Sequence, residues 1–79
     1  MRIAMVGAGY VGLVSGACFA EFGVEVCVVD TDAAKVAALR EGRIPIYEPG
    51  LERLVADNVR ERRLTFTTDL AEAVAGAEA

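Results

Sequence analysis

Residues 7–12 read GAGYVG and match the pattern G-x-G-x-x-G, which can bind the diphosphate of a dinucleotide when it joins a strand to a helix. Each glycine has a chemical reason. Gly7 permits a tight turn, Gly9 lets the diphosphate approach the backbone, and Gly12 allows the helix to pack closely on the sheet. The alternative is a turn that only packs a strand against a helix, which leaves two of the three glycines without a purpose.

An anion at this turn must be held largely by backbone dipoles, because the sequence is acidic. Its net charge is −4, from 8 Lys+Arg against 12 Asp+Glu, and it has no His. The N–H groups of the first helical turn, near Tyr10, Val11 and Gly12, are expected to point at the phosphates, where the helix dipole adds about half a positive charge. The acidity argues against nucleic acid or an anionic membrane as a partner. Without His or a paired-cysteine motif, no metal site is predicted.

Asp30 follows Gly12 by 18 residues and ends an apolar run. An acid about 20 residues after the glycines accepts hydrogen bonds from the adenosine ribose. A 2′-phosphate would meet this carboxylate with a repulsion of several kcal/mol at about 4 Å, and the next residues are Thr31 and Asp32, so NAD is predicted over NADP. The alternative role for Asp30 is a helix cap, which Asp32 fits better. Lys35, the only lysine, is either a solvated surface residue or reaches back over the adenosine site.

The elements that must position these residues alternate between strand and helix. Strands are predicted at 2–6, 24–29 and 64–67, and helices at 11–22, from 33 to Gly42, at 51–59 and at 70–75. This alternation implies a parallel sheet with right-handed crossovers. The predicted fold class is therefore α/β, a partial Rossmann-type doubly wound parallel sheet that contributes strands 1–3 of the order 3-2-1-4 with their crossover helices.

The first strand belongs at the centre of such a sheet, and here it is left as an apolar edge, which is an aggregation hazard. Residues 1–79 are therefore expected to be an N-terminal fragment of a dinucleotide-binding domain, with substrate-binding and catalytic domains absent. Glycines interrupt the apolar residues 1–20, which argues against a membrane-spanning helix or a signal peptide and predicts a cytoplasmic protein.

Other side chains are predicted to be structural. Both cysteines lie in apolar runs, which is typical of inert core thiols: Cys18 and Cys27. The phenylalanines are expected in the core (Phe19, Phe22, Phe66), and three arginines in a solvated turn (Arg60, Arg62, Arg63). Asp69 with Glu72 three residues later predicts a capping box.

Three segments together resemble the N-terminal domain of the UDP-glucose/GDP-mannose dehydrogenase family: GAGYVG at 7–12, VVD at 28–30 and PIYEPGLE at 45–52. The resemblance spans essentially the whole chain, and the tyrosine of the third segment is similar to the UDP-glucose branch. It implies an NAD-dependent UDP-glucose 6-dehydrogenase, which oxidises the sugar C6 alcohol of UDP-glucose to the carboxylate of UDP-glucuronate with two NAD and a water, through a cysteine nucleophile.

Carried over residue by residue, the resemblance matches Val11, Asp30 and Lys35 to the family's cofactor-contacting positions, beside the glycine turn. It places every catalytic residue beyond residue 79, so neither cysteine is the nucleophile and the 79 residues alone are expected to be inactive. It implies a nucleotide-sugar substrate and a homo-oligomer for the full-length protein. The role of residues 47–50 stays open between a stiff structural loop and a substrate contact.

Two other functions fit the motif. A regulatory dinucleotide-sensing module, such as those that gate potassium channels, also begins with a strand, G-x-G-x-x-G, a helix and a strand-ending aspartate. A Rossmann dehydrogenase for another substrate, such as a hydroxyacyl-CoA or phosphogluconate, would keep the fold. The segment PIYEPGLE and the additional helix after it favour the nucleotide-sugar enzyme over both.

Overall fold

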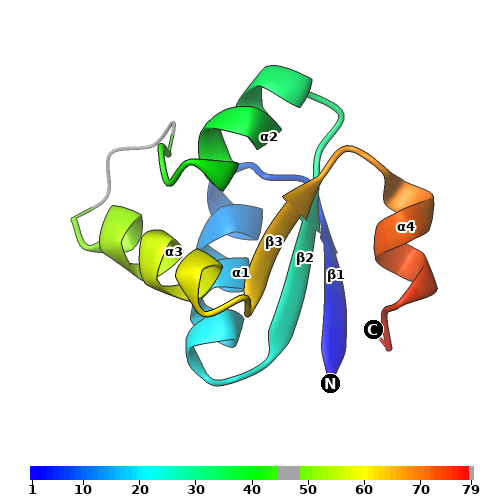
Figure 1. Ribbon diagram of the computed structural model, residues 1–79, viewed down its shortest axis with the longest axis horizontal. Helices are drawn as coiled ribbons and strands as arrows, with labels where there is room; N and C mark the ends of the chain where they lie inside the picture. The colour runs from blue at the N-terminus through cyan, green and yellow to red at the C-terminus, as the bar shows by residue number, and fades with distance from the viewer. Residues whose placement is uncertain (45–48, 79) are drawn as a thin grey trace.

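The computed structural model describes residues 1–44 and 49–78, and the elements follow the predicted order (Figure 1). They are β1 (Arg2–Val6), α1 (Tyr10–Glu21), β2 (Glu25–Val29), α2 (Ala33–Arg40), α3 (Leu51–Arg60), β3 (Leu64–Thr67) and α4 (Leu70–Ala75). None of the helices in these ranges has both the length and the apolar composition needed to cross a membrane. The segment PIYE at 45–48, which carries much of the resemblance, lies outside the described residues.

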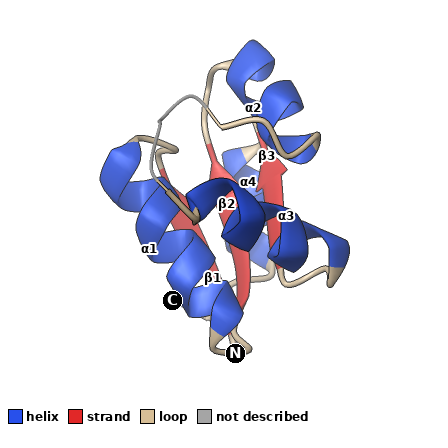
Figure 2. Ribbon diagram, turned by 90° about the vertical axis from the view of Figure 1, so that its left-hand side faces the viewer, coloured by secondary structure: helices blue, strands red, loops and turns tan. Residues whose placement is uncertain are grey.

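The strands form a parallel sheet in the order β1-β2-β3, with Ile3 opposite Val26 and Val28 opposite Phe66. Three helices, α1, α2 and α3, cover one face of the sheet, and α4 lies on the other (Figures 1 and 2). While successive strands are added in one direction across the sheet, right-handed crossovers place the connecting helices on one face. When the direction reverses after β3, the next helix lies on the opposite face. The predicted class, a partial doubly wound α/β sheet, is confirmed.

β1 is an edge strand, as predicted. Its inner edge bonds to β2, as in the contact from the Glu25 N–H to the Met1 carbonyl at 3.2 Å. Because backbone groups alternate along a strand, the Arg2 carbonyl faces the outer edge, where it accepts from the Glu78 N–H at 2.8 Å. The chain after α4 therefore returns to the place that the order 3-2-1-4 gives to a fourth strand.

The core lies between the sheet and α1 and α3. Leu13 of α1 and Leu64 of β3 are fully buried, and Val26 and Val28 of β2 are nearly so. A Cβ at Gly16 would lie 3.2 Å from Val28 Cγ2, so this glycine lets α1 approach β2 closely. The close approach seats the N-terminus of α1 against the carboxyl edge of the sheet.

A buried polar network anchors the C-terminal end of α1. Asn58 of α3 is fully buried, and its amide nitrogen donates to Glu21 Oε1 and to the Leu54 carbonyl, both at 2.9 Å. Its Oδ1 accepts from Arg63 Nε at 3.0 Å, and the same Nε lies 3.0 Å from the Ala20 carbonyl. The prediction of Arg63 as part of a solvated turn is therefore wrong: its guanidinium joins the C-terminal end of α1 to α3.

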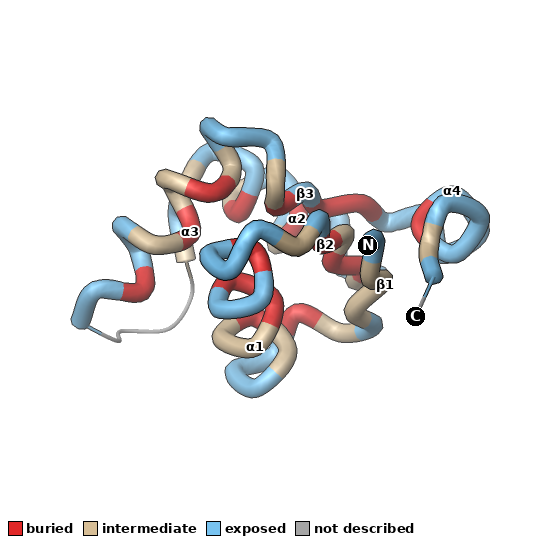
Figure 3. Tube along the Cα trace, turned by 90° about the horizontal axis from the view of Figure 1, so that it is seen from below, coloured by how far each residue is buried: buried red, intermediate tan, exposed pale blue. Residues whose placement is uncertain are grey.

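The prediction of a core position is wrong for Cys18 and Phe19, on the outer flank of α1, and for Phe22, which follows α1 as its C-cap. Phe22 is 85% exposed and Phe19 43%, and Cys18 is exposed as well, whereas Phe66 is buried as predicted and Cys27 is half-buried. α1 is apolar nearly all round, and only one flank of it contacts the sheet. Figure 3 shows α1 alternating between buried and exposed segments, and α4 largely exposed.

Side-chain caps begin two of the helices. Asp32 accepts from the Lys35 N–H at 3.1 Å and caps α2, which confirms the preference for Asp32. Asp69 accepts from the Glu72 N–H at 3.0 Å and caps α4. In a capping box the Glu72 side chain would accept from the Asp69 N–H. Here that N–H donates to Thr67 Oγ1 instead, at 3.1 Å.

Candidate functional site

The predicted site residues meet at the carboxyl edge of the sheet. The Gly7 N–H donates to the Val29 carbonyl at 2.7 Å and joins the glycine turn to the end of β2. The Asp30 N–H donates to the Thr67 carbonyl at 3.1 Å and joins the end of β2 to β3. Ligands of doubly wound sheets bind outside this edge, next to the strand where the order of the chain reverses, which is β1 here.

The three glycines of the motif are needed for three different reasons. Gly7 has φ +96°, a conformation that side chains rarely adopt. Gly9 has an ordinary extended backbone, and a Cβ there would meet nothing within 4 Å, so the space above it is open. A Cβ at Gly12 would lie 2.1 Å from the Gly7 carbonyl oxygen, so this glycine is required by the turn itself.

The N-terminus of α1 faces the open space above Gly9. The N-cap is Gly9, which has no side chain to bond the amides of the first turn, and Leu13 donates to the Gly9 carbonyl at 2.8 Å. An α-helix leaves the N–H groups of its first turn without helical acceptors, and those of Val11 and Gly12 belong to this turn, which carries no acid. Tyr10 and Val11 lie in this turn, and the side chain of Val11 is exposed. The arrangement can bind an anion through backbone amides.

Asp30 links this turn to α2. Its Oδ2 accepts from the Ala8 N–H and its Oδ1 from the Asp32 N–H, both at 2.9 Å. Lys35 Nζ lies 3.8 Å from Oδ2. The Asp32 amide, the Ala8 amide and then the Lys35 ammonium hold the pKa of Asp30 below its usual value, against partial burial, which acts to raise it.

Sequence reasoning found most of this group and missed one member. The structure brings Lys35 back to Asp30, which favours its interpretation as a site residue over a solvated surface lysine. Ala8 is not among the predicted site residues, yet its amide is the contact between the turn and Asp30. A bond between residues 22 apart leaves no local pattern in a single sequence. The ligand contacts of all these residues stay predictions.

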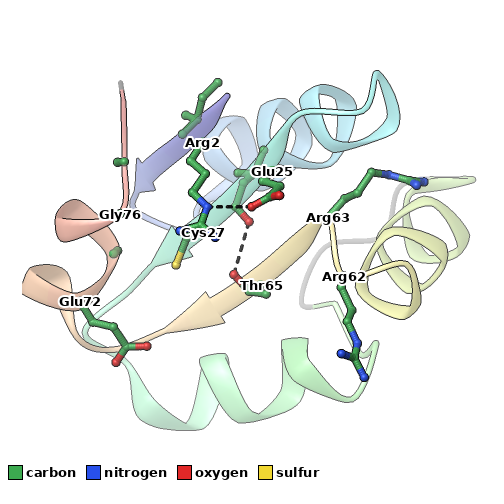
Figure 4. Close-up of a pocket in the computed structure, with 12 residues that line it drawn as sticks. Arg2, Glu25, Cys27, Arg62, Arg63, Thr65, Glu72 and Gly76 are labelled. Carbon is green, nitrogen blue, oxygen red and sulfur yellow. Dashed lines mark hydrogen bonds and ion pairs between the residues drawn. The ribbon is translucent and has the colours of Figure 1, made fainter.

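A pocket of about 390 Å³ lies elsewhere, between the sheet and α4. Figure 4 shows the guanidinium of Arg2 turned toward Glu25, and their Nε and Oε2 atoms are 2.8 Å apart. The pocket also contains Cys27, Thr65 and Glu72, and it shares no residue with the glycine turn. Among the described residues, no three His, Cys, Asp or Glu side chains are grouped to hold a metal.

The lowered pKa of Asp30 predicts how its contribution to stability varies with pH. Because the folded-state pKa lies below the unfolded value of about 3.9, the contribution is present above that pH and is lost as the pH falls through the folded-state pKa. Asp30→Asn should therefore lower the free energy of unfolding at pH 7, and the difference from the parent chain should shrink below about pH 4. Urea unfolding at pH 7, 4 and 2.5 measures this difference.

The matched control for this prediction is Asp32→Asn. It removes a carboxylate two residues away and keeps a side chain that caps a helix as well as aspartate does. Asp32→Asn should lower the free energy of unfolding only slightly at all three pH values. An Asp30→Asn cost that stays constant from pH 7 to 2.5 would show that the charge of Asp30 contributes nothing to folding.

Comparison with known proteins gives one consistent result. The family described as "UDP-glucose/GDP-mannose dehydrogenase family, NAD binding domain" matches residues 1–79. The chain is 60% identical over 78 residues to a UDP-glucose 6-dehydrogenase of Rhizobium meliloti and 56% identical over 78 residues to one of Pseudomonas aeruginosa. Each match covers 99% of this chain but only 18% and 17% of the respective relative, so the chain spans less than a fifth of their length.

A solved structure agrees with the sequence matches. The crystal structure of a ternary complex of GDP-mannose dehydrogenase from Pseudomonas aeruginosa superimposes with a TM-score of 0.93 and 42% identity. The superposition covers 98% of this chain and 18% of that one. The fold described above is therefore that of the corresponding part of a dehydrogenase.

Proposed function

Because this chain belongs to the UDP-glucose/GDP-mannose dehydrogenase family, whose NAD-binding domain matches residues 1–79, we propose that its glycine turn and Asp30 hold the adenosine diphosphate half of NAD. The amides at the N-terminus of α1 bind the diphosphate, and the open space above Gly9 admits it. Asp30 accepts hydrogen bonds from the adenosine ribose. Val11, in the first turn of α1, and Lys35, in the first turn of α2, lie beside the nucleotide.

The contact of Asp30 with the turn carries this proposal. A carboxylate offers about four lone-pair sites, and the two amide bonds occupy one on each oxygen. One site on each oxygen remains for a ribose hydroxyl. The bond from Ala8 to Oδ2 keeps the carboxylate within one residue of Gly9, so ribose and diphosphate can be bound side by side.

We extend the proposal to the whole protein as a nucleotide-sugar oxidoreductase, with UDP-glucose as substrate and UDP-glucuronate as product. Bound NAD supplies the hydride acceptor, and the residues of this chain bind and orient it. The identities of 60% and 56% to two UDP-glucose 6-dehydrogenases, against 46% to the GDP-mannose 6-dehydrogenase of Azotobacter vinelandii, support UDP-glucose over GDP-mannose. A homo-oligomer in the cytoplasm completes the proposal.

Titration of the chain with NAD and NADP, followed through backbone amide shifts in NMR, tests the site. NAD is expected to bind at least about tenfold more tightly than NADP, because a 2′-phosphate would face the Asp30 carboxylate. Shifts should concentrate on residues 7–12 and around Asp30. Asp30→Ala should weaken NAD binding and reduce the preference.

Tighter binding of NADP than of NAD by the unmodified chain would contradict the role of Asp30. The substrate is tested separately, by assaying the complete protein for NAD reduction with UDP-glucose, GDP-mannose and UDP-N-acetylmannosamine. A preference for either of the last two would overturn the substrate proposal and leave the cofactor site unaffected.

A further inference from the structure

Four residues form a line, the outer stripe, along the side of α1 that faces away from the sheet. They follow one another at spacings of four, three and four residues: Val11, Ser15, Cys18 and Phe22. Because a helix turns by about 100° per residue, the centre of the outer stripe lies about 180° from the centre of the residues that α1 buries in the core. Val11 is 76% exposed and Phe22 85%, Cys18 is exposed as well, and only Ser15 is half-buried.

The outer stripe carries no charge. The sequence of α1 and its C-cap contains one charged residue, Glu21, which lies to one side of the stripe and accepts a hydrogen bond from Asn58 at 2.9 Å. The solvent side of a surface helix normally carries charged and polar residues. A line of exposed apolar side chains three turns long, with no charge beside it, is typical of a contact surface.

The order of side-chain sizes along the outer stripe fits a second copy of the same stripe. When two copies of α1 cross antiparallel about a two-fold axis, Val11 meets the partner's Phe22 and Ser15 meets the partner's Cys18. The small side chains then lie at the crossing point, where they let the helix axes approach to about 8 Å. The large side chains lie at both ends, and no charge is buried. Such a two-fold contact uses the same patch on both copies, which is the commonest arrangement in protein dimers.

We propose that the outer stripe is the contact surface of a weak homodimer, in which α1 packs antiparallel against α1 of a second copy. The contact is one helix wide, so it buries less than the roughly 1,200 Å² at which standard interfaces begin, and the dimer is transient. Half of the chain should be dimeric at a concentration on the order of 0.1 mM.

The dimer competes with the cofactor, and this part of the inference rests on the proposed function. Val11 lies in the first turn of α1, next to the open space above Gly9 where the diphosphate is proposed to bind. In the dimer the partner's Phe22 lies against Val11 and covers the approach to this turn. NAD and the second copy therefore exclude each other, and each weakens the binding of the other by the same factor.

Sedimentation of the chain at concentrations from about 10 μM to 1 mM tests the dimer. Phe22→Lys places a charge in the contact and should raise the dissociation constant of the dimer at least about tenfold. The matched control is Val74→Lys, at a residue of α4 that is 53% exposed on the opposite face of the sheet. Lysine suits the C-terminal end of either helix, so both variants should fold. Val74→Lys should change the dissociation constant by less than about twofold.

The outcomes identify the occupant of the outer stripe. A parent chain that stays monomeric up to about 1 mM would overturn the proposal and leave a later segment of a longer family chain as the occupant. A dimer that Phe22→Lys leaves intact, or that Val74→Lys weakens equally, would overturn it too, because the contact would then lie elsewhere. Amide shifts in NMR that change with protein concentration should centre on the outer stripe.

The effect of NAD separates this inference from the proposed function. Saturating NAD should raise the dissociation constant of the dimer at least about tenfold. An intact dimer with NAD bound to both copies would overturn the antiparallel arrangement. A chain that does not bind NAD would refute the proposed function, and the comparison of Phe22→Lys with Val74→Lys would still decide whether the outer stripe forms a dimer.

Discussion

Gly12→Ala is expected to destabilise the fold by about 2 kcal/mol or more, even though alanine is the better helix former. The new Cβ would lie 2.1 Å from the Gly7 carbonyl oxygen, a backbone atom that cannot rotate away. Overpacking costs about 1–3 kcal/mol and more where the backbone must move, whereas alanine in place of glycine returns at most about 1 kcal/mol in a helix. The cost of the clash therefore exceeds the gain in helix propensity, so the free energy of unfolding should fall. The melting temperature should fall by about 10 °C or more.

Thermal and urea unfolding followed by circular dichroism measure this loss. Gly9→Ala is the matched control, since the same methyl group is added three residues earlier, where nothing lies within 4 Å of it. Its cost should stay below about 1 kcal/mol, from the weaker N-cap alone. Equal stability of Gly12→Ala and the parent chain would mean that the turn between β1 and α1 is not as tight as described.

The order of elements could be predicted because local chemistry marks each boundary. Glycines follow β1 and α1, and Asp32 and Asp69 cap the helices that come after β2 and β3. Some of the runs between these markers also have the periodicity of their element, as in the amphipathic α3 and the alternating β3. Alternation of strand and helix then leaves few topologies, and the parallel order β1-β2-β3 is one that the handedness of crossovers favours.

The predictions that are wrong concern side chains whose burial or hydrogen bonding depends on residues distant in the sequence. Nothing in the sequence of α1 distinguishes the flank that contacts β2 from the flank that carries Cys18 and Phe19, because both are apolar. Arg63 looks like its arginine neighbours in the sequence, and its contact with the Ala20 carbonyl, 43 residues away, depends on the packing of α3 against α1. The same holds for the candidate site. The glycine pattern and the offset of Asp30 can be recognised in the sequence, whereas the bond from the Ala8 amide to Asp30 is seen only in the folded chain.

Gly9→Ser is expected to weaken NAD binding at least about tenfold while leaving the chain as stable as the parent or up to about 0.5 kcal/mol more stable. Serine suits the position, because Gly9 is the N-cap of α1, has φ −71° and ψ −177°, and has space for a Cβ. A serine oxygen at the N-cap accepts from the N–H two or three residues later, at Val11 or Gly12. Those are amides that the diphosphate is proposed to use, so the cap competes with the ligand.

The opposite directions of the two effects make this prediction specific. A general loss of structure would lower stability and NAD affinity together, whereas blockage of the diphosphate position lowers affinity alone. Adenosine, which has the ribose and no phosphate, is the control ligand, and its weak binding beside Asp30 should be unchanged in Gly9→Ser. Unchanged NAD affinity in a folded Gly9→Ser chain would place the diphosphate away from the turn. On the proposed function, the glycine at this N-cap leaves the cap open for the diphosphate, and a few tenths of a kcal/mol of helix stability are forgone to keep the amides accessible.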